Sequence, residues 1–352
     1  MTGRPDQKAM PRVLRHVLRG LRSAACAESE AAPLAWRNTF TESLADFADP
    51  RASPTDRVTP RDKVEAAFSL GAAAEASEPR LVALSESMLS ELGGSFQALI
   101  AGADEPTRAR WLVGNERLPG AADPWCSNYG GHQFGTWAGQ LGDGRALSLG
   151  QLHTPAGASW ELQLKGAGPT PYSRFADGLA VVRSSVREFL CSEAMHALGV
   201  PTTRVLSLCT TGDSVPRDMW YRGSFQDEPG AVVCRTAPNF VRFGSFQLPY
   251  SRNDNALTEQ LARFCARSEP SWRGMLDGDE LDYEAWLTNV VQRNARLVAQ
   301  WQALGFVHGV LNTDNMSVLG LTIDYGPFCF IERFNPEFIG EYSSCLPPRC
   351  LR

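Results

Sequence analysis

The feature that most constrains the fold of this chain is a strictly alternating run at residues 160–165, which reads Trp-Glu-Leu-Gln-Leu-Lys. Alternation of apolar and polar side chains predicts a β-strand with one apolar face and one polar face, and Lys165 then faces a polar space. Glycines and prolines in residues 166–171 end the strand, and residues 184–198 predict a helix with Glu188 beside its apolar stripe. The sequence thus predicts a strand followed by a helix, each with one buried face.

Other segments predict further elements of both kinds. Residues 128–152 are dense in glycine and favour turns and short strands, and strand-like runs follow at residues 203–209 and 231–246. Helices are expected at residues 78–99 and 283–304. Because the middle of the chain is mostly strands and the part after it mostly helices, the order predicts an α+β fold.

Length and charge narrow the range of functions. With 352 residues, 43% of them hydrophobic, the chain can bury a substantial core, which at this size usually splits into two lobes with a ligand cleft between them. The formal net charge of -5 argues against nucleic acid as a main partner. No run approaches the ~20 apolar residues that a spanning helix needs, so membrane insertion is not expected. Nine cysteines without a Cys-x-x-Cys pair are interpreted as mostly buried free thiols.

The N-terminal segment has the character of an organelle-targeting peptide. Arginines at positions 12, 15, 19 and 22 lie on one side of a predicted helix and apolar residues on the other, and Asp6 is the only acidic residue before Glu28. We expect residues 1–30 to be a transit peptide and spacer and the localisation to be mitochondrial, with another organelle or the cytoplasm as alternatives. A surface helix with solvated arginines is the other interpretation.

Four charged residues suit the binding of a nucleoside triphosphate. A strand lysine with a helix glutamate resembles the arrangement by which protein kinases hold ATP phosphates, so Lys165 and Glu188 are a candidate pair. Arg235 and Arg242 would add two guanidinium groups whose planar forks match phosphate oxygens. Each feature alone is also compatible with solvated side chains on a protein surface.

A downstream segment resembles the catalytic and metal loops of kinases. It reads His-Gly-Val-Leu-Asn-Thr-Asp-Asn at residues 308–315 and is followed by Ile-Asp-Tyr-Gly at residues 323–326. Asn315 and Asp324 match the two kinase metal ligands, and their oxygen atoms suit Mg²⁺, with Mn²⁺ as an alternative. Val310 occupies the position of the kinase catalytic aspartate and cannot accept a proton, so Asp314 becomes the candidate base. A β-hairpin with polar turn residues is the alternative interpretation.

Three stretches together resemble the selenoprotein O family, namely residues 129–144, 160–171 and 308–315. The resemblance implies a two-lobed, protein-kinase-like pseudokinase fold, with a strand-rich N-lobe at residues 34–250 and a helical C-lobe at residues 251–338. It also implies an enzyme that binds ATP in an inverted orientation and transfers AMP to Ser, Thr or Tyr hydroxyls of proteins, with pyrophosphate as the leaving group.

The family's functional positions can be carried over to this sequence. The resemblance implies ATP contacts at Gly142, Gly144, Arg145, Lys165, Asp177, Gly178, Arg235, Arg242 and Asp324, a partner for Lys165 at Glu188, the proton acceptor at Asp314, and metal ligands at Asn315 and Asp324.

The sequence also departs from the family. After residue 338 the pattern ends, so the C-lobe is expected to be truncated and residues 339–352 to form a divergent tail whose Cys345 and Cys350 are incidental. Cys329 stands where a glycine is usual. Three functions therefore have to be distinguished: an AMP transferase, a nucleotide-binding pseudokinase with an interaction role, and an ordinary phosphotransferase.

Overall fold

The structure is a computed structural model that describes residues 34–52, 60–219, 222–333, 335 and 338, all within a compact unit that begins at Leu34. The predicted transit peptide and the divergent tail lie outside these residues.

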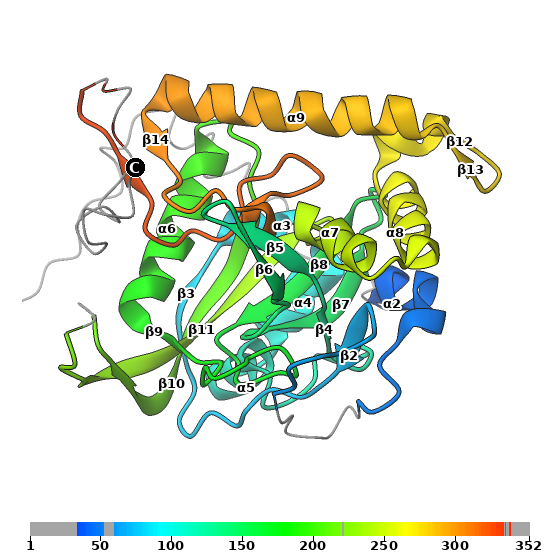
Figure 1. Ribbon diagram of the computed structural model, residues 1–352. Helices are drawn as coiled ribbons and strands as arrows, with labels where there is room; N and C mark the ends of the chain where they lie inside the picture. Colours follow the sequence, from blue (N-terminus) through cyan, green and yellow to red (C-terminus); the bar gives the residue numbers. More distant parts are fainter. Residues whose placement is uncertain (1–33, 53–59, 220–221, 334, 336–337, 339–352) are drawn as a thin grey trace, which may run out of the picture. The chain divides into compact units, whose positions relative to one another are not determined.

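A large antiparallel sheet organises this unit (Figure 1). Within the described residues it has nine strands, in the order β2-β4-β7-β8-β11-β10-β3, with β1 beside β7 and β9 beside β11. The strands are β1 Ala35–Arg37, β2 Phe68–Leu70, β3 Arg80–Leu84, β4 Trp125–Ser127, β7 Ala146–His153, β8 Ser159–Lys165, β9 Ala180–Val181, β10 Arg204–Arg217 and β11 Gln226–Ala237. The strand predicted at residues 160–165 is therefore β8, at the centre of the sheet.

Helices and small hairpins complete the unit. The helices are α2 Thr39–Ser43, α3 Glu86–Glu91, α4 Gly94–Gly102, α5 Glu105–Val113, α6 Val182–Ala197, α7 Phe243–Ser251, α8 Asn255–Ser268 and α9 Tyr283–Leu304, with short 3-10 turns η2 Ala45–Phe47, η3 Pro270–Met275 and η4 Thr313–Asn315. Two-stranded ladders join β5 Gly130–Gln133 to β6 Thr136–Gln140, β12 Leu276–Asp277 to β13 Glu280–Leu281, and β14 Phe306–Val307 to β15 Cys329–Phe330. The α+β fold class is confirmed.

Helices pack on both faces of the sheet. Leu162 and Leu164 of β8 lie in a core with Met88, Phe96 and other residues of α3, α4 and α5. On the opposite face, valines of β10 and β11 pack against α6. Because successive side chains of a strand point to opposite faces, Lys165 lies on the α6 side of the sheet, away from Leu162 and Leu164.

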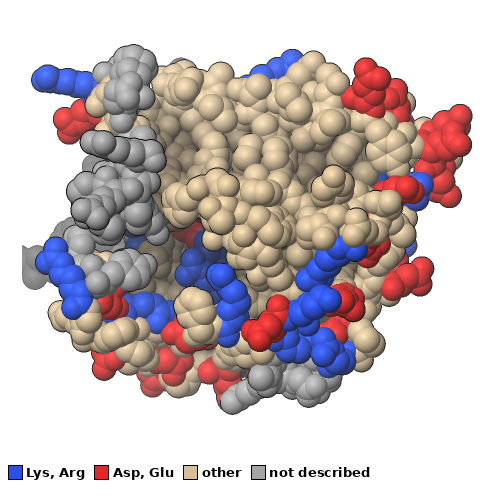
Figure 2. Space-filling view, in the orientation of Figure 1, with Lys and Arg blue, Asp and Glu red and all other residues tan. Residues whose placement is uncertain are grey.

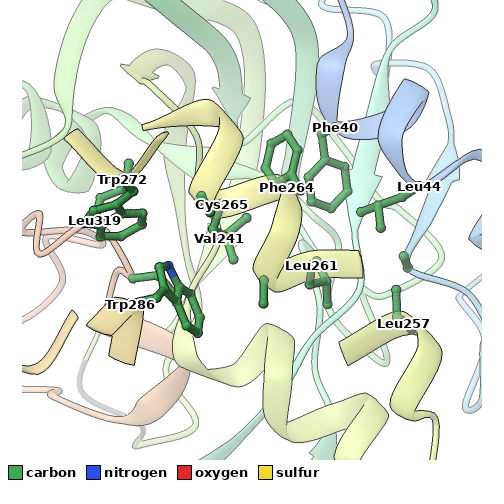
Figure 3. Packing of buried hydrophobic residues seen from close by; sticks show 14 of the residues in the cluster. Phe40, Leu44, Val241, Leu257, Leu261, Phe264, Cys265, Trp272, Trp286 and Leu319 are labelled. Atoms are coloured by element: carbon green, nitrogen blue, oxygen red, sulfur yellow. The ribbon is translucent and has the colours of Figure 1, made fainter. Parts of the chain in front are cut away.

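A separate aromatic core joins α8 and α9 to the first residues of the unit (Figure 3). Phe40 of α2 stacks on Trp125 with ring centroids 4.5 Å apart, and its edge meets Phe264 of α8 at 5.2 Å. Trp272 and Trp286 continue this core toward α9. The segment before residue 70 is thus packed against helices that come much later in the chain.

Two predicted elements are wrong in their extent. The helix expected at residues 78–99 is instead β3 followed by α3 and α4. Ser85 caps α3 by accepting from the Met88 amide at 3.2 Å, and Gly93, with a left-handed φ of 92°, separates α3 from α4. The strand-like run at residues 231–246 ends at Ala237, before Pro238, and its last residues begin α7.

Other predictions are confirmed. The helices expected at residues 184–198 and 283–304 are α6 and α9, and α9 ends at Gly305, which has a left-handed φ of 68°. In the described part of the chain, six cysteines are free and five of them are buried. No helix among these residues is long and apolar enough to cross a membrane.

Candidate active site

All but one of the predicted site residues line a single cleft of about 1140 Å³. They are Gly142, Gly144, Arg145, Lys165, Asp177, Gly178, Arg235, Arg242, Asp314, Asn315 and Asp324. The remaining residue, Glu188 of α6, is buried and forms an ion pair with Lys165. The fold thus brings together residues that are widely separated in the sequence.

Asp324 is the centre of an ion-pair cluster. Its Oδ1 atom lies 3.1 Å from Lys165 Nζ and 2.7 Å from Arg235 Nη1, and its Oδ2 atom lies 2.9 Å from Arg242 Nη1. Burial alone would raise the pKa of the Asp324 carboxyl, but the three cations outweigh burial and hold this pKa well below its usual range. Asp324 is therefore an anion at neutral pH.

The register of two neighbouring strands aims the cations into the cleft. Lys165 of β8 is opposite Val233 of β11, and Gln163 is opposite Arg235, so the side chains at 163, 165 and 235 share one face. Arg235 donates a hydrogen bond to Gln163 Oε1. Glu188 lies 2.7 Å from Lys165 Nζ and 3.3 Å from Arg235 Nη1, so one buried carboxylate holds two cations.

The charges of this cluster balance. The carboxylate of Asp143 lies 3.7 Å from Arg242 Nη2 and accepts a hydrogen bond of 2.6 Å from Ser127 Oγ. Among the described residues of the cluster, the cations Lys165, Arg235 and Arg242 are matched by the anions Glu188, Asp143 and Asp324. An anionic ligand would have to compete with these carboxylates or bring its own counter-ion.

Asp314 lies in η4 and also lines the cleft, and its carbonyl oxygen accepts a hydrogen bond of 2.9 Å from Arg242 Nη1. Gln133 Nε2 donates to its Oδ2 atom at 2.9 Å, whereas Oδ1 has no hydrogen-bond partner among the described residues. Burial raises the pKa of the Asp314 carboxyl, although the bond from Gln133 partly opposes this. A Cβ on Gly131 would lie 2.9 Å from Asp314 Oδ1, so glycine at 131 leaves the room that this carboxylate occupies.

The β5–β6 hairpin holds the loop around Asp314 through successive residues. The backbone amide of His132 donates to Thr313 Oγ1 at 2.7 Å, and the amide of Phe134 donates to Asn312 Oδ1 at 3.2 Å. Together with Gln133, three consecutive hairpin residues therefore position three consecutive loop residues.

Asn315 and Val310 lie next to each other in the cleft. Asn315 Nδ2 donates to the Val310 carbonyl oxygen at 2.9 Å, so the Asn315 amide oxygen is the end that could meet a ligand. The Val310 side chain offers no group that accepts a proton. His308 is buried, and its Nε2 atom lies 2.8 Å from the Ile323 carbonyl oxygen, which ties this loop to the residue before Asp324.

The glycine-rich segment is packed against the ring of Tyr172. A Cβ on Gly142 would lie 2.5 Å from the Tyr172 ring, and a Cβ on Gly144 would lie 2.9 Å from the Tyr172 carbonyl oxygen. Thr170 Oγ1 donates to the Asp143 carbonyl oxygen at 2.7 Å, and Ser173 Oγ donates to the Gly144 carbonyl oxygen. Close packing against Tyr172 therefore accounts for glycine at both positions, independently of any ligand.

Tyr172 connects this wall of the cleft to the start of the unit. Its hydroxyl lies 2.9 Å from Ser69 Oγ, which donates to Asp49 Oδ2 at 2.8 Å. Asp49 also forms an ion pair with Arg61, whose backbone amide donates to the Pro171 carbonyl oxygen at 2.8 Å. The wall is thus supported by residues that precede the central strands.

Asp177 makes its strongest contacts with the β10–β11 hairpin. Its two carboxylate oxygens lie 2.6 and 3.0 Å from the guanidinium of Arg217. Burial would raise the pKa of the Asp177 carboxyl, but Arg217 outweighs it and lowers the pKa, with a smaller effect from Arg145. Gly178 follows with a left-handed φ of 72° and packs against Gly168.

Figure 2 shows one face of the molecule, on which charged side chains of both signs gather in the lower half and the upper middle is largely uncharged. Because the two signs are interspersed, the charged side chains form no broad basic surface on this face.

Comparison with known proteins identifies the family. The model of the family "Protein adenylyltransferase SelO" matches residues 75–346 of this chain. The chain belongs to the SelO family. The resemblance to selenoprotein O that the sequence motifs indicate is thereby confirmed.

Bacterial relatives of the SelO family extend this comparison. "Protein nucleotidyltransferase YdiU" of Xanthomonas oryzae pv. oryzae strain PXO99A is 54% identical over 279 residues, which are 79% of this chain and 52% of the relative. The YdiU protein of Xanthomonas axonopodis pv. citri strain 306 is 55% identical over 279 residues, with the same coverage. That of Xanthomonas campestris pv. campestris strain 8004 is 52% identical over 291 residues, 82% of this chain and 54% of the relative. The chain spans about half the length of these curated relatives.

The relatives correct one prediction. Because they are bacterial proteins, the mitochondrial localisation expected from residues 1–30 is wrong. An arginine-rich, amphipathic composition describes a transit peptide but is not specific to one.

Sequence reasoning missed several residues that line the cleft of this SelO-family chain or support its side chains. Gln163 alternates with Lys165 on the polar face of β8, and that pattern could have identified it. Asp143 lies between the two glycines of the predicted nucleotide segment. Gln133 and Tyr172 gave no signal of their own, because their roles depend on contacts with Asp314 and with the glycine segment that only the fold creates.

Proposed function

We propose that the protein transfers AMP from ATP to Ser, Thr or Tyr hydroxyls of other proteins and releases pyrophosphate. The observation that carries this proposal is that one cleft contains three buried or nearly buried cations around Asp324 and, separately, a buried carboxylate at Asp314. The first group suits a triphosphate and the second suits proton removal from an acceptor hydroxyl. Family membership and relatives named nucleotidyltransferases support it.

The proposal includes a kinase-like arrangement. Residues 34–250 would form a strand-rich lobe and residues 251–338 part of a helical lobe, with ATP between them. The order of elements supports this, since the nine sheet strands end at Ala237 and the longest helices of the following part, α8 and α9, come after it.

Lys165, Arg235 and Arg242 would bind the phosphates of ATP. Their charge is directed at Asp324, Glu188 and Asp143, and phosphate oxygens would offer the same cations further acceptors. Arg235 and Arg242 are almost fully buried, so they cannot move far and present a fixed arrangement of donors. We propose that Gly142, Gly144, Arg145, Asp177 and Gly178 line the remainder of the ATP site.

Asn315 and Asp324 would hold a divalent metal ion such as Mg²⁺ or Mn²⁺. Their donor set fits, because an amide oxygen and a carboxylate face one cleft and Mg²⁺ is commonly bound by one or two protein oxygens together with phosphates and water. In the described part of the chain no group of three or more His, Cys, Asp or Glu is arranged to hold a metal, so phosphates and water would complete the coordination. When bound, the ion would neutralise charge on the departing pyrophosphate.

Asp314 would accept the proton in the transfer step. The acceptor hydroxyl oxygen forms a bond to the α-phosphorus, the bond from that phosphorus to the oxygen bridging to the β-phosphate breaks, and pyrophosphate leaves with the electron pair. The hydroxyl proton goes to Asp314, whose raised pKa makes it a stronger base than an exposed carboxylate. Gln133 would fix one carboxylate oxygen and leave Oδ1 for the proton.

Val310 argues against an ordinary phosphotransferase. It lines the cleft at the position where the kinase loop carries an aspartate, and its side chain cannot take a proton. Labelling with ATP distinguishes a pseudokinase without transfer activity from an AMP transferase.

The test uses the full chain with Mg²⁺ or Mn²⁺ and ATP labelled in either the α- or the γ-phosphate, with the chain itself and a bacterial protein extract as acceptors. Label on protein only from the α position, with an AMP increment in the intact mass, is expected. Asp314→Asn should still bind ATP but lose labelling, whereas Asp279→Asn, an exposed aspartate outside the cleft, should behave as the parent.

Three results would contradict parts of this proposal. Label from the γ position alone would make the protein a kinase. ATP binding without label from either position would make it a nucleotide-binding pseudokinase. Full labelling by Asp314→Asn would show that another group accepts the proton.

A further inference from the structure

Phe175 is an aromatic residue that lines the cleft yet remains almost fully exposed. Its exposed fraction is 94%, the highest among the large hydrophobic residues that are described as exposed. A phenylalanine in water gains free energy when a partner covers its ring. The ring is approached by the guanidinium of Arg174, whose central carbon lies 5.7 Å from the ring centroid.

The backbone on both sides of Phe175 is held in place. Tyr172, three residues before it, is 1% exposed and packs on Gly142. Gly178, three residues after it, lies so close to Gly168 that a Cβ would come within 2.3 Å of the Gly168 backbone. Phe175 therefore lies in a short loop whose two ends, at Tyr172 and Gly178, are fixed by packing.

Strain marks the same loop. Arg174 has a left-handed φ of 56°, which is unfavourable for a residue with a long side chain. Residues held in such conformations cluster at ligand sites, where surrounding contacts maintain them. Here the neighbouring contact is Ser173 Oγ, which donates to the Gly144 carbonyl oxygen.

The two parts of the cleft differ in chemistry. One part carries Lys165, Arg235 and Arg242, which suit phosphates. The loop of Phe175 and the facing β10–β11 hairpin add exposed aromatic rings to the same cleft, including Phe225, which is 71% exposed, beside charged side chains such as Arg217. A nucleoside triphosphate also has two chemically different ends, and the base is its planar, weakly polar end.

We propose that Phe175 is the platform on which the nucleobase stacks, with the base on one face of the ring and Arg174 over the other. Aromatic side chains stack on bases because every base presents a π-face, and an adjacent arginine adds a cation–π contribution. This inference rests on the proposed function. It assigns a contact to the nucleobase of the same ATP molecule whose phosphates would bind the three cations.

The experiment compares two ligands that share their phosphates and differ in the base. Titration calorimetry on the full chain with Mg²⁺ measures the Kd of ATP and of inorganic tripolyphosphate. Phe175→Ala should weaken ATP binding about tenfold or more and leave tripolyphosphate binding unchanged, and Phe175→Trp should retain ATP binding. Because Phe175 is exposed, Phe175→Ala should unfold at the parent's temperature.

Tyr250→Ala is the matched control. Tyr250 is also an exposed aromatic, at 75%, but it lies in α7 and outside the residues that line the cleft. It should bind both ligands as the parent does.

The outcomes separate this inference from the proposed function. If the parent binds ATP and Phe175→Ala binds it equally well, the platform is refuted while the proposed function stands. An equal loss for ATP and tripolyphosphate would also refute it, because the loop would then act on the phosphates. If Phe175→Ala keeps the Kd of ATP but raises the KM for a protein acceptor, the ring contacts the acceptor instead. A parent that binds neither ligand would refute the proposed function itself.

Discussion

Replacing Asp324 by asparagine should destabilise the ligand-free protein, because Asp324 is one of three carboxylates that balance three cations. The substitution keeps the size of the side chain, and asparagine, like aspartate, tolerates the left-handed backbone that residue 324 adopts, with φ at 56°. What changes is the charge: Lys165, Arg235 and Arg242 would then face only Glu188 and Asp143.

The expected loss in the free energy of unfolding is about 3 kcal/mol. Removing one partner of a buried ion pair typically costs ~3–5 kcal/mol. The lower end applies because the Asp324 side chain is 23% exposed and the two arginines keep other acceptors, namely Gln163 for Arg235 and the Asp314 carbonyl oxygen for Arg242.

Urea unfolding without nucleotide or metal measures this loss. Asp177→Asn is the control, since Asp177 is 42% exposed and its pair with Arg217 lies near the surface, where such a pair contributes less than about 1 kcal/mol. Adding tripolyphosphate should reduce the deficit of Asp324→Asn, because phosphate oxygens supply the missing negative charge. A loss for Asp324→Asn no larger than that for Asp177→Asn would refute the reasoning.

Two further predictions concern Glu161 and Gln133. Burial raises the pKa of Glu161 from 4.5 to about 8, so between these pH values the folded state keeps the proton on Glu161 and the unfolded state releases it. The contribution of this protonated carboxyl to the free energy of unfolding is complete below pH 4.5 and is lost as the pH rises toward 8. Between pH 5 and pH 7.5 the free energy of unfolding of the parent, measured in urea, should therefore fall by about 3 kcal/mol more than that of Glu161→Gln. An equal pH dependence in both proteins would show that Glu161 is ionised in the folded state. Gln133→Leu should slow AMP transfer about tenfold or more with an unchanged ATP Kd, because it frees the Asp314 carboxylate, and single-turnover labelling at the parent's rate would contradict that positioning role.

Local sequence patterns were sufficient to predict a helix or strand that buries a single face. Period-two alternation predicted β8, and helical periodicity predicted α6 and α9, because each packs a single stripe against its core. The helix predicted at residues 78–99 failed for the opposite reason. Its apolar residues serve a strand and two short helices in turn, and Ser85 and Gly93 are local signals that outweigh the periodicity.

The site was predictable residue by residue, but its organisation was not. Motif spacing identified Lys165, Asp314 and Asp324, yet nothing in the sequence indicates that Asp324 contacts three cations at once. Such a cluster depends on the register of β8 against β11 and on the path of a loop that brings in Asp324, which follows Lys165 by 159 residues and Arg235 by 89. The prediction of mitochondrial targeting failed because composition alone cannot distinguish a targeting peptide from another arginine-rich segment.

The bond from Tyr172 to Ser69 has a consequence for how this protein can be divided. The match to the SelO family begins at residue 75, and that boundary would be a natural place to start a shortened fragment. A fragment cut there would lose Asp49, Arg61 and Ser69, which support Tyr172 and therefore the glycine segment packed on its ring. The smallest piece that could keep the cleft intact thus extends well beyond the residues that define the family.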